Sequence, residues 1–119
     1  MEEAVRGILD FASHQQATPQ IAAAYAIMVT EEEGLRSDDL LAAPGTEDAA
    51  DAVFDKVGAI GPAATDSVLV DLIIDEVYGL PSTLAATLAG FLYAKMREDG
   101  VGAAGLFRRT LLSAVPLPG

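Results

Sequence analysis

The chain has 119 residues, of which 51% are hydrophobic, and its 18 acidic and 7 basic residues give a formal net charge of −11 at pH 7. The periodic runs of Leu, Ile, Val and Phe exclude an acidic disordered chain, and the length suffices for one domain with a single core. The chain contains no cysteine, which excludes thiol chemistry, disulfides and Cys-ligated metal sites and suits a reducing cytoplasm.

The charge distribution argues against nucleic acid as a direct partner. Residues 1–64 carry 12 acidic and 3 basic side chains, a net charge of −9, whereas residues 65–119 carry 6 and 4, a net charge of −2. Binding to phosphates needs a surface of Lys and Arg, so we expect no direct contact with nucleic acid.

Targeting and membrane segments are also not expected. The first three residues include two acids, whereas a signal peptide begins with basic residues. The longest uncharged stretch, residues 77–94, is about long enough to span a bilayer, but it contains Gly79 and Pro81 near its start. We therefore expect a cytoplasmic protein; the alternative is that this stretch lies against a membrane or a hydrophobic subunit.

The first two predicted helices follow from apolar spacing and end signals. Apolar residues three and four apart predict a short amphipathic helix over residues 2–15. Thr18, with a side-chain oxygen for the N-cap, and Pro19, with a preset φ, predict the start of the next helix. Gly34 is the expected end of that helix.

A short helical turn and an amphipathic helix are expected next. The short turn covers residues 37–43, before Pro44 and Gly45. Thr46 is the predicted N-cap of the longer helix, which has one buried and one acidic face. The apolar stripe consists of Ala49, Ala50, Val53, Phe54 and Val57, and the acids are Glu47, Asp48, Asp51 and Asp55.

Residues 65–78 are predicted to form the central helix. Their Val and Ile content would also suit a buried strand, but Ser67, Asp71 and Asp75 recur every four residues, which places them together only on a helix. Because this polar strip is narrow, neighbouring helices are expected to cover most of the remaining surface.

Two further helices complete the predicted fold. Ser82 is expected to cap a helix that continues to Asp99, and small residues four apart on two of its sides allow close packing with more than one neighbour. The last helix covers residues 103–114, and the proline-containing tail 115–119 is extended. The sequence therefore predicts a single all-α domain, residues 1–119, built as a compact bundle of five to six helices.

The sequence offers little for catalysis or metal binding. His14 is the only histidine, and it follows Asp10 by one turn at the end of a short helix, where a surface position is expected. Asp71 and Asp75 could act as a carboxylate pair, but this spacing is typical of the solvent edge of a helix. No phosphate-binding, dinucleotide-binding or calcium-binding motif is present. We therefore expect no enzyme, no cofactor and no metal.

An acidic segment is the first candidate for partner binding. Glu31, Glu32 and Glu33 occupy the predicted last turn of a helix, where the dipole disfavours acids, and Asp38 and Asp39 follow closely. We expect the three glutamates to lower stability in favour of a basic partner. A solvated surface, or general acid enrichment, is the alternative.

The C-terminal helix is the second candidate, because the chain is more apolar than a small bundle needs. Phe107 and Leu111, one turn apart, are the predicted anchors of a partner contact, and Arg108 and Arg109 place basic charge beside them. Three nearby glycines are expected to loosen the connection to this helix.

The sequence thus predicts a helical interaction or assembly subunit that docks on a protein partner or on itself. One alternative is an acidic protein that mimics nucleic acid and blocks a nucleic-acid-binding groove. A second alternative is a small-ligand binder or a minor enzyme with a pocket between helices. The C-terminal helix would be the apolar docking element, and residues 31–39 the electrostatic one.

Overall fold

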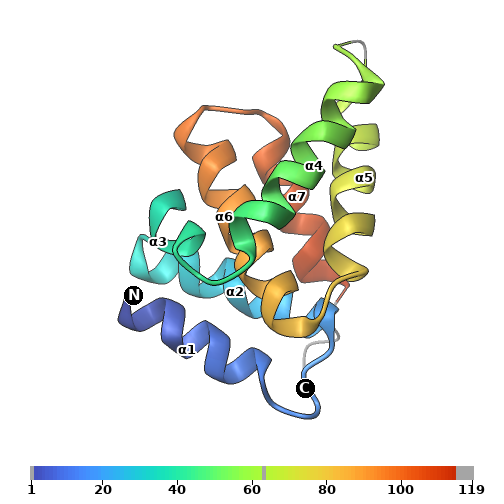
Figure 1. Cartoon of the computed structure of the whole chain (residues 1–119). Helices are drawn as coiled ribbons and strands as arrows, with labels where there is room; N and C mark the ends of the chain where they lie inside the picture. Colours follow the sequence, from blue (N-terminus) through green and yellow to red (C-terminus); the bar gives the residue numbers. More distant parts are fainter. Residues whose placement is uncertain (1, 63, 115–119) are drawn as a thin grey trace.

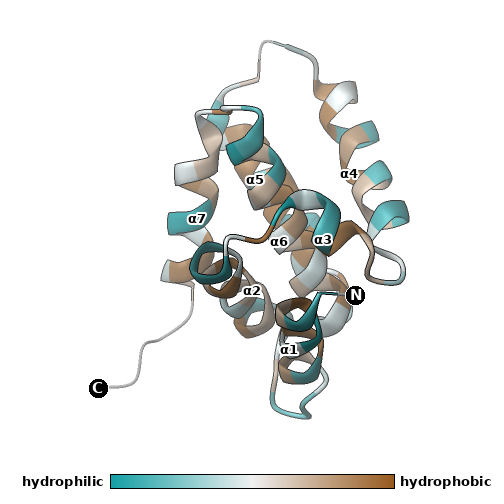
Figure 2. Ribbon diagram, turned by 90° about the vertical axis from the view of Figure 1, so that its left-hand side faces the viewer, coloured by the Kyte–Doolittle hydropathy of each residue, from teal (hydrophilic) through white to brown (hydrophobic). Residues whose placement is uncertain are grey.

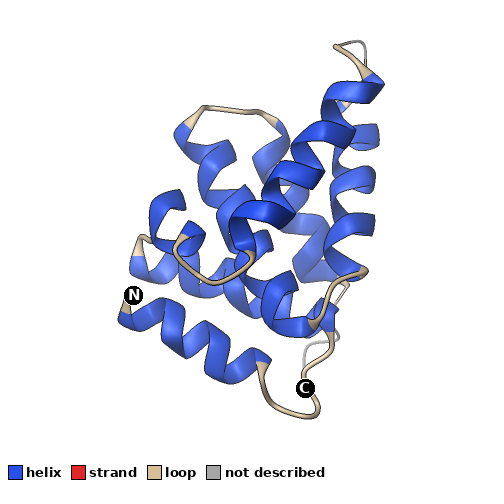
Figure 3. Cartoon of the chain, viewed as in Figure 1, coloured by secondary structure: helices blue, strands red, loops and turns tan. Residues whose placement is uncertain are grey.

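The computed structural model describes residues 2–62 and 64–114, which form seven α-helices and no strand (Figure 1, Figure 3). The all-α prediction is confirmed. The helices outnumber the predicted five to six because the short segment after Gly34 is a helix in its own right. The predicted tail 115–119 lies outside the described residues. The helices are α1 (Glu3–Ala12), α2 (Pro19–Glu33), α3 (Ser37–Leu41), α4 (Thr46–Ile60), α5 (Asp66–Tyr78), α6 (Ser82–Glu98) and α7 (Ala103–Ser113).

The boundaries of α2 follow the predicted signals. The Thr18 hydroxyl accepts a hydrogen bond from the Ile21 amide at 3.2 Å, and Pro19 is the first helical residue. Gly34 ends the helix with a φ of 60°, a conformation that favours glycine. The Leu35 amide then donates to the Thr30 carbonyl at 3.0 Å and completes a Schellman motif.

Thr46 and Ser82 are not N-caps, which corrects two predictions. Each is the first residue of its helix, after Gly45 and Pro81 respectively. The buried Thr46 hydroxyl is hydrogen-bonded to that of Thr87 at 2.8 Å, which ties α4 to α6. The Ser82 hydroxyl donates to the Ala17 carbonyl at 2.6 Å and ties α6 to the loop between α1 and α2. Both hydroxyls therefore join separate elements.

The centre of the fold is α6, not the predicted helix 65–78. α6 packs against each of the other six helices that are described (Figure 1). Its residues 85–94 are all buried, whereas on α5 the side chain of Val68 is 49% exposed. The physical reason is side-chain size, because small residues such as Ala85, Ala86, Ala89 and Gly90 permit close approach of neighbouring helices to α6, whereas α5 carries mainly larger apolar residues.

The uncharged stretch 77–94 is divided between two helices. It contains the end of α5, the turn around Gly79 and Pro81, and most of α6. Within residues 2–62 and 64–114, no helix combines the length and apolar character that a membrane crossing requires.

At Gly90, α6 packs closely against α2 and α3. A Cβ atom at this position would lie 3.0 Å and 3.1 Å from the two terminal carbons of Leu40, and 3.1 Å from the Thr30 hydroxyl. Leu40 is fully buried, and the Thr30 hydroxyl donates to the Ala26 carbonyl at 2.7 Å. Both neighbours are therefore held in place, and the close packing of α2 and α3 on α6 depends on the missing side chain.

Gly90→Ala should destabilise the protein despite the better helix propensity of alanine. Overpacking costs roughly 1–3 kcal/mol, and the gain in propensity is about 1 kcal/mol. Urea unfolding measures the difference. Gly105→Ala is the matched control, because no atom lies within 4 Å of the added Cβ; this variant should be more stable than the wild type. Equal gains at both positions would contradict the close packing at Gly90.

Candidate functional site

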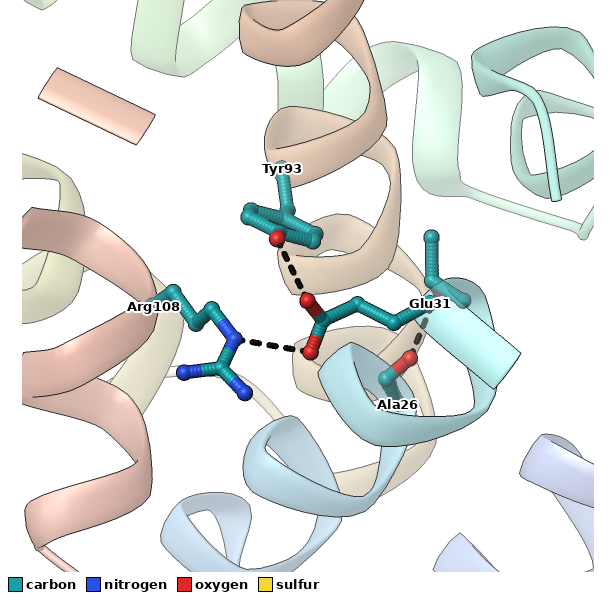
Figure 4. Close-up of polar contacts among 5 residues, drawn as sticks. Ala26, Glu31, Tyr93 and Arg108 are labelled. Atoms are coloured by element: carbon teal, nitrogen blue, oxygen red, sulfur yellow. Dashed lines mark hydrogen bonds and ion pairs between the residues drawn. The ribbon is translucent and has the colours of Figure 1, made fainter. Parts of the chain in front are cut away.

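Glu31 joins three helices and is not a free acid of the predicted patch (Figure 4). Its carboxylate accepts a hydrogen bond from the Tyr93 hydroxyl of α6 at 2.9 Å and from Nε of Arg108 on α7 at 2.7 Å. The guanidinium of Arg97 lies over the Tyr93 ring, 5.5 Å from its centroid. The contact links α2, α6 and α7, so Glu31 contributes to stability although the helix dipole opposes it.

The protonation of Glu31 and Tyr93 follows from this contact. Burial raises the pKa of the Glu31 carboxyl, but the hydrogen bonds from Arg108 and Tyr93 outweigh it, and the net pKa lies below the usual 4.5. Burial and the bond to Glu31 both raise the pKa of Tyr93. The ion pair between Glu31 and Arg108 is therefore held in its charged form at neutral pH.

The other acids of the predicted patch differ in environment. Glu32, Glu33 and Asp38 are exposed. Asp39 is half-buried, and its carboxylate accepts a hydrogen bond from the Arg36 amide at 2.9 Å at the start of α3. The predicted patch 31–39 thus contains three exposed acids and two that stabilise the fold.

A carboxylate that sequence reasoning missed lies next to this segment. Glu98, at the end of α6, accepts hydrogen bonds from the Ser37 amide at 2.7 Å and the Ser37 hydroxyl at 2.8 Å. The bond from the Ser37 amide is the main reason that the pKa of Glu98 lies below 4.5. Ser37 and Glu98 are far apart in sequence, so no local pattern could have revealed the pair.

The C-terminal helix belongs to the core of the chain, which corrects its predicted role as a docking element. Phe107 and Leu111 are fully buried, so neither can serve as an exposed anchor. Arg108 is held by Glu31, whereas Arg109 is exposed. The connection to this helix is also ordered: the Val101 amide donates to the Met96 carbonyl at 2.8 Å, as in a Schellman motif. The apolar surplus of α7 is therefore used inside the protein.

An apolar groove of about 200 Å³ lies between α4, α5 and α6. α4 and α7 both pack on α5 and α6 and stand apart in Figure 2. The lining residues of the groove are Val53, Phe54, Val57, Leu69, Ile73, Leu92, Lys95, Met96, Asp99, Val101 and Ala103.

Two large apolar side chains of the groove face solvent. Phe54 was predicted to be buried but is 46% exposed, and its inner edge contacts Phe91 in an edge-to-face arrangement with centroids 6.3 Å apart. Val101, which follows the glycine that ends α6, is 42% exposed. The periodicity of α4 indicates which residues face inward, but it does not indicate that α4 and α6 diverge enough to uncover Phe54.

The residues weighed for catalysis are not assembled into a site. Asp71 and Asp75 are exposed on the outer side of α5, and His14 is exposed, with Nδ1 accepting from the Gln16 amide at 3.4 Å. Among the described residues, no three acids or histidines are grouped so that they could hold a metal ion.

Comparisons with protein-family models, with curated proteins and with solved structures found no match to this chain. The groove and the acidic side chains around it are therefore interpreted from their own geometry and chemistry.

Replacement of Glu31 by Gln should lower stability by about 1 kcal/mol, since a charge-assisted contact at partly exposed side chains is lost. The side chains of Glu31 and Arg108 are 30% and 41% exposed. Glu32→Gln is the matched control and should gain a few tenths of a kcal/mol at low salt, because it relieves the helix dipole. Thermal unfolding of both variants measures these opposite changes in stability. A gain in stability for both would mean that the dipole outweighs the contact.

Stability should fall in acid through Glu31 and Glu98. Both carboxyls have a pKa below the usual 4.5 in the folded chain, so their contribution is complete above that value and is lost as the pH falls through the folded pKa. Urea midpoints measured from neutral to acidic pH should show a smaller loss for the double variant Glu31→Gln, Glu98→Gln. Glu33→Gln, an exposed control, should keep the wild-type slope; an unchanged slope in the double variant would contradict the assignment.

Proposed function

We propose that the protein is a non-enzymatic interaction subunit of the cytoplasm that docks a protein partner in the groove between α4, α5 and α6. This keeps the predicted class of function and moves the apolar contact from the C-terminal helix to the groove. The observation that carries the proposal is the side chain of Phe54, which is 46% exposed at the mouth of an apolar groove.

The composition of the groove supports a docking role. Its walls are almost entirely aliphatic or aromatic, and Lys95 and Asp99, its two charged residues, form an ion pair at 3.5 Å. Exposure of such an apolar surface to water costs free energy, and this free energy is recovered when a partner covers the surface. A second, electrostatic surface near the C-terminal end of α6 consists of the exposed acids Glu32, Glu33 and Asp38.

The groove also favours a second candidate function, the binding of a small apolar ligand. A volume of about 200 Å³ exceeds the roughly 150 Å³ of a cavity that accepts benzene. A ligand of that size would be covered only in part, because the groove is open to solvent beside Phe54. A protein segment, which can cover the rim as well, therefore suits the site better.

Affinity purification with quantitative mass spectrometry tests the proposed function. The tagged wild type, Phe54→Ser and Val68→Ser are compared after nuclease treatment. Val68 is the matched control because it is 49% exposed but lies outside the groove. We expect one or a few proteins to be retained by the wild type and Val68→Ser and lost from Phe54→Ser.

Two results would contradict the proposal. Retention of the same proteins by all three forms would exclude the groove as the docking site. Loss of a small molecule, with no protein lost from Phe54→Ser, would favour the ligand-binding function.

A further inference from the structure

Asp99 lines the apolar groove, and exposed acidic side chains of α4 and α5 stand near it. On α4, Glu47 and Asp51 precede Phe54 by seven and three residues, which places them on the same side of the helix, and both are exposed. On the opposite wall stands Asp99, half of its side chain exposed. Asp66 approaches the same end of the groove, with a carboxylate oxygen 3.8 Å from the position of a Cβ on Gly102.

The basic residues near the groove are paired with acids. Lys95 lies 3.5 Å from Asp99, and Lys56 forms an ion pair with Glu76 on the far side of α4 from Phe54. These two pairs are neutral, so the exposed acids Glu47, Asp51 and Asp66 leave a net negative charge beside the apolar floor of the groove. A partner with lysine or arginine on both sides of an apolar side chain complements this arrangement.

From this charge pattern, and resting on the proposed function, we propose that the groove binds a basic amphipathic helix of a partner protein. One leucine or phenylalanine of that helix fills the groove beside Phe54, and basic residues on each side of it pair with Asp51 on α4 and Asp66 on α5. The volume of about 200 Å³ suits one such side chain, since roughly 150 Å³ accepts a benzene ring. In recognition of this type, binding depends both on the apolar side chain that fills the groove and on the charged residues beside it.

The same charge pattern disfavours the other occupants. A second copy of the chain carries the same net charge of −11, so two copies repel each other as they approach. Anionic lipid surfaces and nucleic acids are repelled for the same reason. A basic helix is instead attracted before contact, and its affinity should fall as salt screens the rim.

Fluorescence anisotropy with synthetic helical peptides of about 14 residues tests the proposal. The first peptide has leucines at helical spacing and lysines elsewhere, the second has glutamate in place of each lysine, and the third has serine in place of each leucine. We expect the lysine and leucine peptide to bind about tenfold or more tighter than either control at low salt, and to weaken as salt is added.

Variants of the full chain locate the binding. Phe54→Ser should weaken the lysine and leucine peptide about fivefold or more, and the pair Asp51→Asn, Asp66→Asn should reduce both its affinity and its salt dependence. The pair Asp71→Asn, Asp75→Asn changes the net charge equally on the outer side of α5 and should leave the affinity within about twofold.

If the lysine and glutamate peptides bind equally and Phe54→Ser abolishes the binding of both, the groove is a docking site but its partner is not basic. Binding insensitive to Phe54→Ser would overturn the site itself. Failure of every peptide, together with a copurified protein that needs Phe54, would overturn the helical occupant but not the proposed function. Phe54-dependent dimers in sedimentation, or Phe54-dependent binding to anionic vesicles, would assign the groove to another occupant.

Discussion

The small side chains of α6 are the constraint on which the rest of the fold depends. α6 contacts the six other described helices, and its buried residues include Ala85, Ala86, Ala89, Gly90 and Ala94, whose small side chains permit close approach of a neighbouring backbone. At Gly90 an added methyl group would lie only 3.0 Å from Leu40. α4 meets α6 through the Thr46–Thr87 hydrogen bond and through the contact of Phe54 with Phe91, and the groove lies beside this second contact.

The acidic residues of this protein have two separate uses. Glu31 and Glu98 hold elements together through hydrogen bonds with residues distant in sequence, while Asp51 and Asp66 are exposed near the groove. A net charge of −11 therefore does not measure the strength of an interaction surface. A basic helix can pair with the acids that lie beside an apolar floor, because burial of its apolar side chain brings its basic residues close to these acids.

Helix positions were predictable from the sequence, whereas their packing was not. Thr18, Pro19 and Gly34 act locally, so their signals gave the bounds of α2. Hydrophobicity alone indicates α5 as the centre, because this helix is rich in large apolar residues, but the smaller residues of α6 allow more helices to pack on it. Glu31 and Arg108 lie on helices that are far apart in sequence, so no sequence pattern predicts their contact. The burial of Phe107 depends on where α7 packs, which the sequence does not indicate. The groove depends on the divergence of α4 from α6, which is a tertiary property.

The position of α6 late in the chain has a consequence for biosynthesis. α1, α2 and α3 all pack on residues 82–98, so their apolar faces have no permanent cover while the first eighty or so residues leave the ribosome. At about 5–20 residues per second, this interval lasts several seconds, and Ile8, Ile27 and Leu40 are then exposed to solvent or to chaperones.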